Sequence, residues 1–384
     1  YLAGQSGLIQ VPTGSGKTYA AIMGPLAEML ESLSPDYSNP GDSNPAKKRS
    51  KTSQKSGEHQ AQPNQLLAKG LKLLYITPLR ALSRDIEQSI KRPIDEMAWP
   101  ITVESRTGDT PSSRKTRQMK TMPDILITTP ESLAVMLSYK GAQKRFGTLR
   151  CVVLDEWHEL ISSKRGTQSE LCLAHLRSLQ PALRTWAVSA TLGNLQEAAQ
   201  AAVGLGVDPV IIQSTLRRET VIHSVLPESV DSFPWGGHLG LRMFETLIDA
   251  LDIAKSTLIF TTTRAQAERW FQALDFALPQ YGGKIALHHG SIDKAEREAI
   301  EAGVKTGTIK WVVCTSSLDL GVDFQPVERV VQIGSAKNLA RLLQRAGRSA
   351  HVPEGTSEVF FLPTNALELL EISAFRRGLA AGAI

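Results

Sequence analysis

The chain has 384 residues, of which 42% are hydrophobic and 21% are charged, and its formal net charge is +5. This length predicts two domains, and the composition is that of ordinary globular proteins rather than of disordered or fibrous chains. No apolar run approaches the ~20 residues that span a bilayer, so we expect no membrane partner. The small positive charge permits a polyanionic partner without requiring one. The chain starts at Tyr1 rather than at Met, and we expect it to be part of a longer protein.

Short β-rich runs alternate with amphipathic stretches, which predicts parallel sheets covered by helices on both faces. The segment 34–65 interrupts this pattern because it contains no Leu, Ile, Val, Met, Phe or Trp, and we expect a disordered surface insertion there. Its basic run at 47–51 is interpreted as part of a solvated loop, with nucleic-acid contact or a nuclear signal as alternatives. The predicted strands are, in a first series, 7–11, 72–77, 101–105, 125–128, 151–155, 185–188 and 210–213, and in a second series, 257–261, 284–288, 310–314, 329–333 and 357–362.

The two series predict two α/β domains in tandem with a cleft between them. The first domain is expected to cover residues 1–216 and the second to cover residues 241–384. The stretch 217–240 contains Pro227, Pro234 and a Gly-Gly pair, which are typical of a linker.

The three cysteines, Cys151, Cys172 and Cys314, lie far apart among apolar residues. The sequence has no Cys-x-x-Cys pair, which argues against a zinc ribbon or an iron–sulfur cluster. Buried, reduced thiols are typical of a cytoplasmic protein, and the cytoplasm is the location that we predict.

A phosphate-binding loop is predicted at 12–18, between an apolar strand and the helical stretch 19–30. Glycines let backbone N–H groups converge on phosphate oxygens, and a helix N-terminus adds positive potential. Lys17 is expected to reach the β- and γ-phosphates, and Thr18 to bind Mg²⁺. Val11 occupies the place of the first glycine of the strict pattern, and a Gly-rich turn with an incidental lysine is the alternative. The predicted nucleotide-binding residues of this loop are Thr13, Gly14, Ser15, Gly16, Lys17 and Thr18.

Asp155 and Glu156 end an apolar strand, which places two carboxylates at the edge where α/β sheets bind ligands. Asp155 is expected to bind Mg²⁺, and Glu156 is a candidate to orient or deprotonate an attacking water. The alternative is that the acidic pair only caps the following helix.

Arg345 and Arg348 lie three residues apart on a predicted helix over 338–349, so they share one face. Two guanidinium groups on one face suit a developing phosphoryl charge, and a solvated basic face is the alternative. The segment 315–323 follows a strand and again places hydroxyls and carboxylates at a strand end, with a simple turn as the alternative.

Taken in order, these motifs resemble the motor core of superfamily 2 DExH-box helicases. Within that superfamily, the segment 155–160 followed by Lys164-Arg165-Gly166, together with 344–351, resembles the Lhr-like group. The variant of this motif that has Trp157 resembles the branch called ligase-associated DEXH-box helicases. The segments that carry the resemblance are 12–18, 77–82, 129–132, 155–158, 189–191, 258–260, 288–291, 315–323 and 344–351.

The resemblance implies two RecA-like domains with ATP and Mg²⁺ between them. It implies an ATP-dependent DNA helicase or translocase that moves 3′ to 5′ on single-stranded DNA and acts in DNA repair. Single-stranded or tailed duplex DNA would be the partner, with repair ligases or nucleases as further partners. An RNA helicase or RNA-stimulated ATPase is one alternative, and an ATP-gated clamp that does not unwind is another.

Carried onto this sequence, the resemblance also assigns roles to single residues. Arg345 and Arg348 would act as arginine fingers, and Gln344 would lie near the γ-phosphate. The residues that close the cleft would be Gly321 and Asp323, and those that couple hydrolysis to movement would be His158, Ser189 and Thr191. The residues that contact nucleic acid would be Thr77, Arg80, Thr107, Gly108, Thr129, Pro130, Arg264, His289, Gly290 and Thr315.

Overall fold

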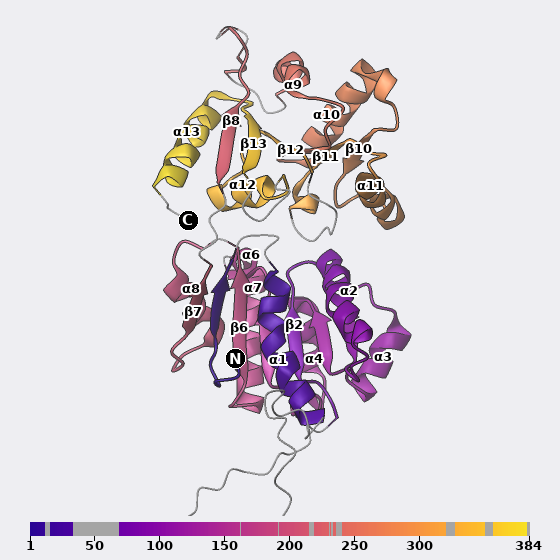
Figure 1. Ribbon diagram of the computed structural model, residues 1–384, viewed down its shortest axis with the longest axis vertical. Helices are drawn as coiled ribbons and strands as arrows, with labels where there is room; N and C mark the ends of the chain where they lie inside the picture. Colours follow the sequence, from indigo (N-terminus) through magenta and orange to yellow (C-terminus); the bar gives the residue numbers. More distant parts are fainter. Residues whose placement is uncertain are drawn as a thin grey trace, which may run out of the picture.

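The chain forms two α/β domains, one above the other in Figure 1, as a computed structural model shows. The predicted insertion at 34–65 lies outside the residues that the structure describes. The described residues are 1–11, 16–33, 69–161, 163–190, 192–214, 219–229, 231, 233–235, 240–319, 327–349 and 356–381.

The first domain is built on a seven-stranded sheet in which every pairing is parallel, in the order β3-β4-β2-β5-β6-β1-β7. Its strands are β1 (Gly7–Gln10), β2 (Leu73–Ile76), β3 (Val103–Arg106), β4 (Ile125–Thr128), β5 (Cys151–Leu154), β6 (Arg184–Ser189) and β7 (Val210–Gln213). Its helices are α1 (Lys17–Leu33), α2 (Arg80–Glu96), α3 (Ser112–Lys120), α4 (Pro130–Ser138), α5 (Ala142–Phe146), α6 (Trp157–Ile161), α7 (Lys164–Leu179) and α8 (Leu195–Val203).

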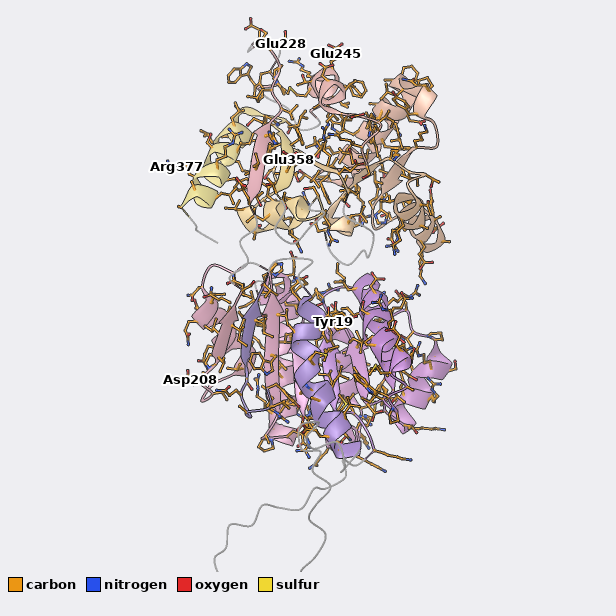
Figure 2. The ribbon with its side chains drawn as sticks, viewed as in Figure 1. Tyr19, Asp208, Glu228, Glu245, Glu358 and Arg377 are labelled. Atoms are coloured by element: carbon orange, nitrogen blue, oxygen red, sulfur yellow. The ribbon has the colours of Figure 1, made fainter. Side chains whose placement is uncertain are left out.

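Helices cover both faces of this sheet, which explains why its inner strands are apolar throughout. Cys151 and Val153 of β5 pack with α1 and α2, whereas Val152 and Leu154 pack with α4 to α8. On the first face, the Tyr19 hydroxyl of α1, labelled in Figure 2, donates to the Ser89 carbonyl of α2 at 3.0 Å. The two hydrophobic clusters hold the ends of the strands in fixed positions.

The second domain has a six-stranded parallel sheet in the order β10-β11-β9-β12-β13-β8. Helices α9 and α10 pack on one face, and α11, α12 and α13 pack on the other. The strands are β8 (Thr220–Ser224), β9 (Thr257–Phe260), β10 (Ile285–His288), β11 (Trp311–Cys314), β12 (Arg329–Ile333) and β13 (Ser357–Leu362). The helices are α9 (Phe244–Ala250), α10 (Arg264–Ala277), α11 (Lys294–Thr306), α12 (Leu339–Ala346) and α13 (Ala366–Ala380), with short 3₁₀ turns at Leu241–Met243, Pro279–Tyr281 and Ser316–Leu318.

Strand β8 corrects the predicted linker at 217–240. It pairs in parallel with β13, and Ile222 lies beside Val359. Arg376 of α13 donates to the Ile222 carbonyl at 2.7 Å. The prediction was wrong here because β8 is a short edge strand whose other residues are only half-buried, so its sequence lacks the apolar run of the inner strands.

Two sequence features have simple structural counterparts. Cys151, Cys172 and Cys314 are all buried and form no disulfide with one another. Among the described helices, none combines the length and the apolar character that crossing a membrane requires.

We expect Ile222→Ala to lower the free energy of unfolding by about 2–5 kcal/mol, because it removes a buried side chain from the second domain. Urea unfolding followed by circular dichroism measures the change. Leu226→Ala, at a position that is 47% exposed, is the control and should have little effect. Equal stability of the two variants would contradict a place for β8 in the core.

Candidate functional site

A lysine and two carboxylates meet at the carboxyl edge of the first sheet. Asp155 and Glu156 follow β5 directly, and Lys17 begins α1. The Lys17 Nζ atom lies 2.7 Å from Glu156 Oε1, and the two side chains are 10% and 9% exposed. Glu156 has a φ of 45°, a strained conformation for a residue other than glycine that is typical of functional sites. The structure thus brings together the three residues that the sequence places in one site.

The two carboxylates differ in their proton affinity. Burial and the neighbouring charge of Glu156 raise the pKa of Asp155 to about 7, and Lys17 offsets only part of this. Burial also acts on Glu156, but the charges of Lys17 and His158 hold its pKa below the ordinary value. Lys17 is paired with Glu156, which leaves Asp155 as the buried carboxylate that a divalent cation would stabilise.

Two hydroxyls next to Asp155 show whether a metal ion fits there. The hydroxyl of Tyr75, on β2, interacts with the side chains of Thr18 and Asp155. Tyr75 is fully buried, and its hydroxyl makes no hydrogen bond of ordinary geometry. Its contacts with Thr18 and Asp155 thus fall short of ordinary hydrogen bonds, and a bound group beside them would satisfy this buried hydroxyl better. Because Mg²⁺ prefers oxygen ligands, the predicted ligands Thr18 and Asp155 fit this ion.

His158 connects this site to the neighbouring strand β6. Its Nδ1 atom lies 2.9 Å from Ser189 Oγ and 3.6 Å from Glu156 Oε2. Burial lowers the pKa of His158, although the charges of Glu156 and Glu159 offset part of this effect. Two of the three predicted coupling residues are therefore in contact.

Charged groups of the second domain face this site across the cleft, where α6 and α12 lie at the facing ends of the two domains (Figure 1). The Arg341 Nη2 atom of α12 is 3.6 Å from Glu159 Oε2 of α6. Burial lowers the pKa of Arg348, and the charges of Glu156 and Asp319 offset part of this effect. A second, exposed pair joins Arg84 to Glu298 at 2.7 Å.

Gln344 on α12 is 3% exposed, and neither end of its side-chain amide has a hydrogen-bond partner. Leaving both amide atoms unsatisfied in a buried position is costly. This state fits a side chain that gains partners when a ligand enters, as the prediction for Gln344 requires.

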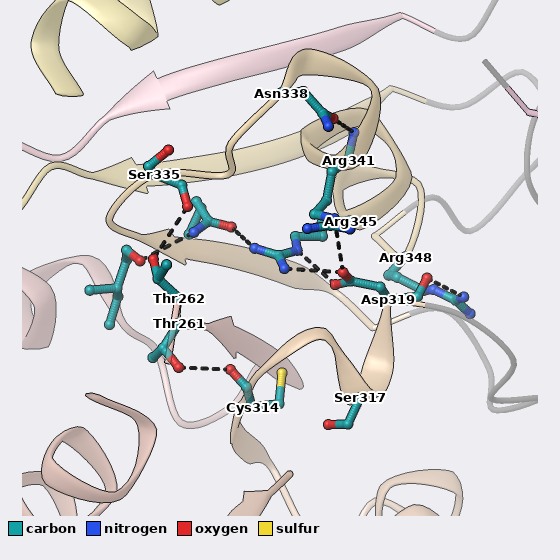
Figure 3. A network of polar contacts seen from close by, with 12 residues as sticks. Thr261, Thr262, Cys314, Ser317, Asp319, Ser335, Asn338, Arg341, Arg345 and Arg348 are labelled. Carbon is teal, nitrogen blue, oxygen red and sulfur yellow. Dashed lines mark hydrogen bonds and ion pairs between the residues drawn. The ribbon is translucent and has the colours of Figure 1, made fainter. Parts of the chain in front are cut away.

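Arg345 differs from its predicted role. Its Nε and Nη2 atoms donate to the two carboxylate oxygens of Asp319 at 2.7 and 3.1 Å, and its Nη1 donates to Gln332 (Figure 3). Arg345 is buried and also lies over the Phe260 ring. With its guanidinium used inside the second domain, the structure does not support an arginine finger at this position.

The Arg345–Asp319 pair instead holds the segment that carries Arg348. Arg348 Nη2 donates to the Asp319 backbone carbonyl at 2.9 Å, as Figure 3 shows. Arg341 Nε lies 3.4 Å from the Asp319 carboxylate. Sequence reasoning missed Asp319 as a site residue, although it lies in a segment noted for polar groups at a strand end.

The predicted nucleic-acid residues of the first domain follow β2, β3 and β4, which are neighbours in the sheet. Arg80 is exposed, and its Nη1 atom is 2.9 Å from Asp109 Oδ1. A Cβ atom on Gly108 would lie 2.7 Å from the guanidinium carbon of Arg80, so the glycine makes room for this side chain. Arg80 and Gly108 therefore lie together at the surface.

The other predicted contacts in this domain are not at the surface. Thr77, Thr107, Thr129 and Pro130 are buried. Thr107 accepts a hydrogen bond from Asp109 N–H, and the hydroxyl of Thr129 donates to Ser132. Because these side chains are buried, contact of the turns with a phosphate group would fall to their backbone, and a role for these residues stays a prediction.

The second domain gathers its predicted contacts at the ends of β9, β10 and β11, again neighbouring strands. Exposed Arg264 donates to the Ser291 hydroxyl, next to exposed Gly290. His289 is buried, and its Nε2 atom is 3.3 Å from Glu268. Thr315 is also buried, which leaves Arg264 and Gly290 as the accessible members of this set.

Each of the two domains matches a model of a known protein family. Residues 1–198 match the family model described as DEAD/DEAH box helicase, which is more than half of the chain. The chain belongs to the DEAD/DEAH box helicase family. Residues 242–352 match the helicase conserved C-terminal domain, which is expected of a helicase core of this family.

Relatives of this helicase include Lhr proteins. It is 33% identical over 381 residues to the ATP-dependent helicase Lhr-Core of Methanocaldococcus jannaschii, covering 96% of this chain and 41% of that protein. It is 30% identical to the Lhr helicase/uracil glycosylase of Escherichia coli, covering 98% of this chain and 26% of that protein. The structure of Mycobacterium smegmatis helicase Lhr bound to ssDNA and AMP-PNP is similar with a TM-score of 0.77 and 26% identity, covering 99% of this chain and 46% of that one.

These relatives agree with the resemblance to the Lhr-like group, and the predicted fold of two tandem RecA-like domains is confirmed. The chain spans less than half the length of each of the three proteins. Placement in the ligase-associated branch stays a prediction.

Several predicted site residues lie outside the described part of the chain, so their roles stay predictions. They are Thr13, Gly14, Ser15, Thr191, Gly321 and Asp323. In contrast, Tyr75 was missed because an aromatic residue in an apolar strand predicts only a core position.

Asp319→Ala should lower the free energy of unfolding by about 3–5 kcal/mol, because it leaves the buried Arg345 charge without its partner. Urea unfolding tests this, with Asp249→Ala on the exposed side of α9 as the control. A loss of stability no larger than that of the control would show that the pair does not hold the second domain together.

The pKa of Asp155 predicts a pH dependence of stability. The pKa of about 7 in the folded, metal-free protein is above the ordinary 3.8, so between these values the folded state binds more protons than the unfolded state. The free energy of unfolding should therefore fall as the pH rises through this window. Asp155→Asn removes this titrating carboxyl, so the free energy of unfolding of the metal-free variant should depend less on pH. Urea unfolding at about pH 5 and about pH 8 would measure the difference. The same pH dependence in both proteins would argue against it.

Proposed function

We propose that this chain is the motor core of an ATP-dependent helicase that uses Mg²⁺ and moves on single-stranded DNA. The observation that carries the proposal is the division of charged groups between the domains. Lys17 and Glu156 pair in the first domain beside Asp155, and Arg348 is held by Asp319 in the second, where Arg341 reaches Glu159 of the first domain. A site divided in this way is complete only when the domains are together, which lets triphosphate binding control their separation. The names of the Lhr relatives support the same activity.

The residues of the first domain divide the chemistry among them. Lys17 would leave Glu156 and bind the β- and γ-phosphates, since a triphosphate offers it more negative charge than one carboxylate. Thr18 and Asp155 would hold Mg²⁺, which neutralises phosphate charge when bound. Once Lys17 has moved, Glu156 is free to orient the attacking water and accept its proton.

The second domain would supply the charge that stabilises the transition state. Arg348 is the candidate arginine finger. Its guanidinium donates to the backbone carbonyl of Asp319, and Arg345 in turn holds the Asp319 carboxylate. Gln344 would contact the γ-phosphate with an amide that is otherwise unsatisfied. His158 and Ser189 would carry the change at the phosphate to the rest of the first domain through their contact.

Nucleic acid would lie along the strand ends of both domains. Arg80 and Arg264 are exposed there and would contact phosphates, which fixes the position of a strand without reading its sequence. DNA is favoured because the Mycobacterium smegmatis helicase Lhr structure has ssDNA bound. A role in DNA repair is favoured by the second part of the name of the E. coli relative, uracil glycosylase. The 3′ to 5′ direction is implied by the resemblance alone, and the cytoplasmic location is inferred from the cysteines. The names of the relatives given above do not support repair ligases or nucleases as partners.

The decisive experiment compares ATP hydrolysis with matched DNA and RNA strands, and strand displacement on duplexes with a 3′ or a 5′ tail. Stimulation by DNA and displacement from the 3′ tail are expected. Stimulation by RNA alone would favour an RNA helicase. Stimulated hydrolysis without displacement from either tail would favour a translocase or clamp that does not unwind.

Arg348→Ala should reduce the turnover number for ATP by about 10³–10⁵ while leaving the dissociation constant of ATP close to that of the unchanged protein. Steady-state hydrolysis and fluorescent-nucleotide binding measure the two quantities. Arg269→Ala on the exposed face of α10 is the matched control, because it removes the same charge elsewhere in the second domain. Turnover close to normal in Arg348→Ala would exclude Arg348 from this role.

A further inference from the structure

The motif Lys164-Arg165-Gly166 contributes to the resemblance but has no role in the site described above. Arg165 lies in the first turn of α7. Its Nη1 atom donates to the Pro78 carbonyl at 2.6 Å, and its Nε atom donates to Glu131 Oε1 at 2.5 Å. One guanidinium therefore joins the loop after β2 to the start of α4 after β4. These are two of the three segments of the first domain that the sequence assigns to nucleic-acid contact; the third follows β3.

Gly166, next to Arg165, holds the start of α7 close to α6. A Cβ atom on Gly166 would lie 2.1 Å from the Leu160 carbonyl oxygen, so only glycine lets α7 start this close to α6. Ser163 caps α7 by accepting a hydrogen bond from Gly166 N–H. Helix α6 carries His158, which contacts Ser189 at the end of β6. Arg165 is thus fixed to the element that follows Asp155 and Glu156.

Arg165 also lies at the boundary between the two domains. It lines a pocket of about 130 Å³ together with Pro78 and Glu159 of the first domain and Asp319 and Arg341 of the second. Glu159 and Arg341 form the ion pair across the cleft, and Asp319 holds Arg348. The side chain that ties the nucleic-acid loops together therefore lies where the two domains meet.

We propose that Arg165 is a positioning residue that couples nucleic-acid binding to ATP turnover. By holding Pro78 and Glu131 together, it fixes the two loops in the spacing that a strand needs, and through Gly166 it connects them to α6. This inference rests on the proposed function and assigns a role to a residue outside the phosphate site.

The chemistry of arginine suits this role. A planar guanidinium offers donors in a fixed fork, so it can serve a carbonyl and a carboxylate in two directions at once, which a single ammonium group does less well. Glu131 is a charged acceptor: burial would raise its pKa, but its backbone N–H, Thr129 and Arg165 together lower it. Hydrogen bonds to an ionised acceptor are stronger than neutral ones.

The test measures ATP hydrolysis over a range of DNA concentrations for Arg165→Ala, Arg165→Lys and Glu131→Gln. We expect the DNA concentration at half-maximal stimulation to rise by about ten- to a hundredfold in both Arg165 variants, with the KM for ATP within about twofold. Glu131→Gln should show a smaller rise, and Arg165→Lys combined with Glu131→Gln should cost less than the sum of the single changes. Lys164→Ala removes the same charge from the exposed neighbouring position and should leave the DNA requirement unchanged.

The outcomes separate this inference from the proposed function. If neither DNA nor RNA stimulates the unchanged protein, the proposed function fails, and the inference fails with it. If the unchanged protein is stimulated and Arg165→Lys needs no more DNA than it does, the inference alone is overturned. An equal rise in Lys164→Ala would overturn it as well, because the effect would then follow from charge. Should Arg165→Ala fail to fold, Arg165→Lys and Glu131→Gln carry the test.

Discussion

The ion pair between Lys17 and Glu156 is the interaction on which the rest of the site depends. It offsets one of the two negative charges in a buried cluster of two carboxylates and one ammonium group. The compensation is incomplete, since burial and Glu156 still raise the pKa of Asp155. Lys17 thus supplies part of the charge balance of this site from within the protein, and a triphosphate with its metal would complete it.

The second domain solves the corresponding problem with arginine. Asp319 gathers three arginines: Arg345 through both carboxylate oxygens, Arg341 at longer range and Arg348 through the backbone carbonyl. Because Arg345 is fully engaged, it acts as a support, and the arginines toward the cleft are the ones left to act on the first domain. The first domain therefore presents a site with excess negative charge, and the second domain presents arginines that Asp319 holds in place. These opposite charges favour the approach of the two domains.

Most of the strands and the fold class could be predicted because inner strands of a parallel sheet are apolar along their whole length. Strand β8 could not, since an edge strand such as 220–224 buries little and its partner β13 lies far along the chain. The helix predicted over 338–349 ends at Ala346, so Arg348 lies in the turn after α12. Helical spacing could not separate the roles of Arg345 and Arg348, which depend on Asp319 from another element. The same limit applies to Thr77 and Thr129, whose motifs gave no sign that their side chains are buried.

The place of β8 at the edge of the second sheet has a consequence for synthesis. Among the described strands, its one neighbour in the sheet is β13, which comes last in chain order of the strands of the second domain. The first domain can fold as soon as β7 has emerged, but β8, which follows directly, must wait unpaired until nearly all of the second domain exists. An unpaired strand edge can associate with other chains, so this interval is when the nascent protein is most exposed to misassembly.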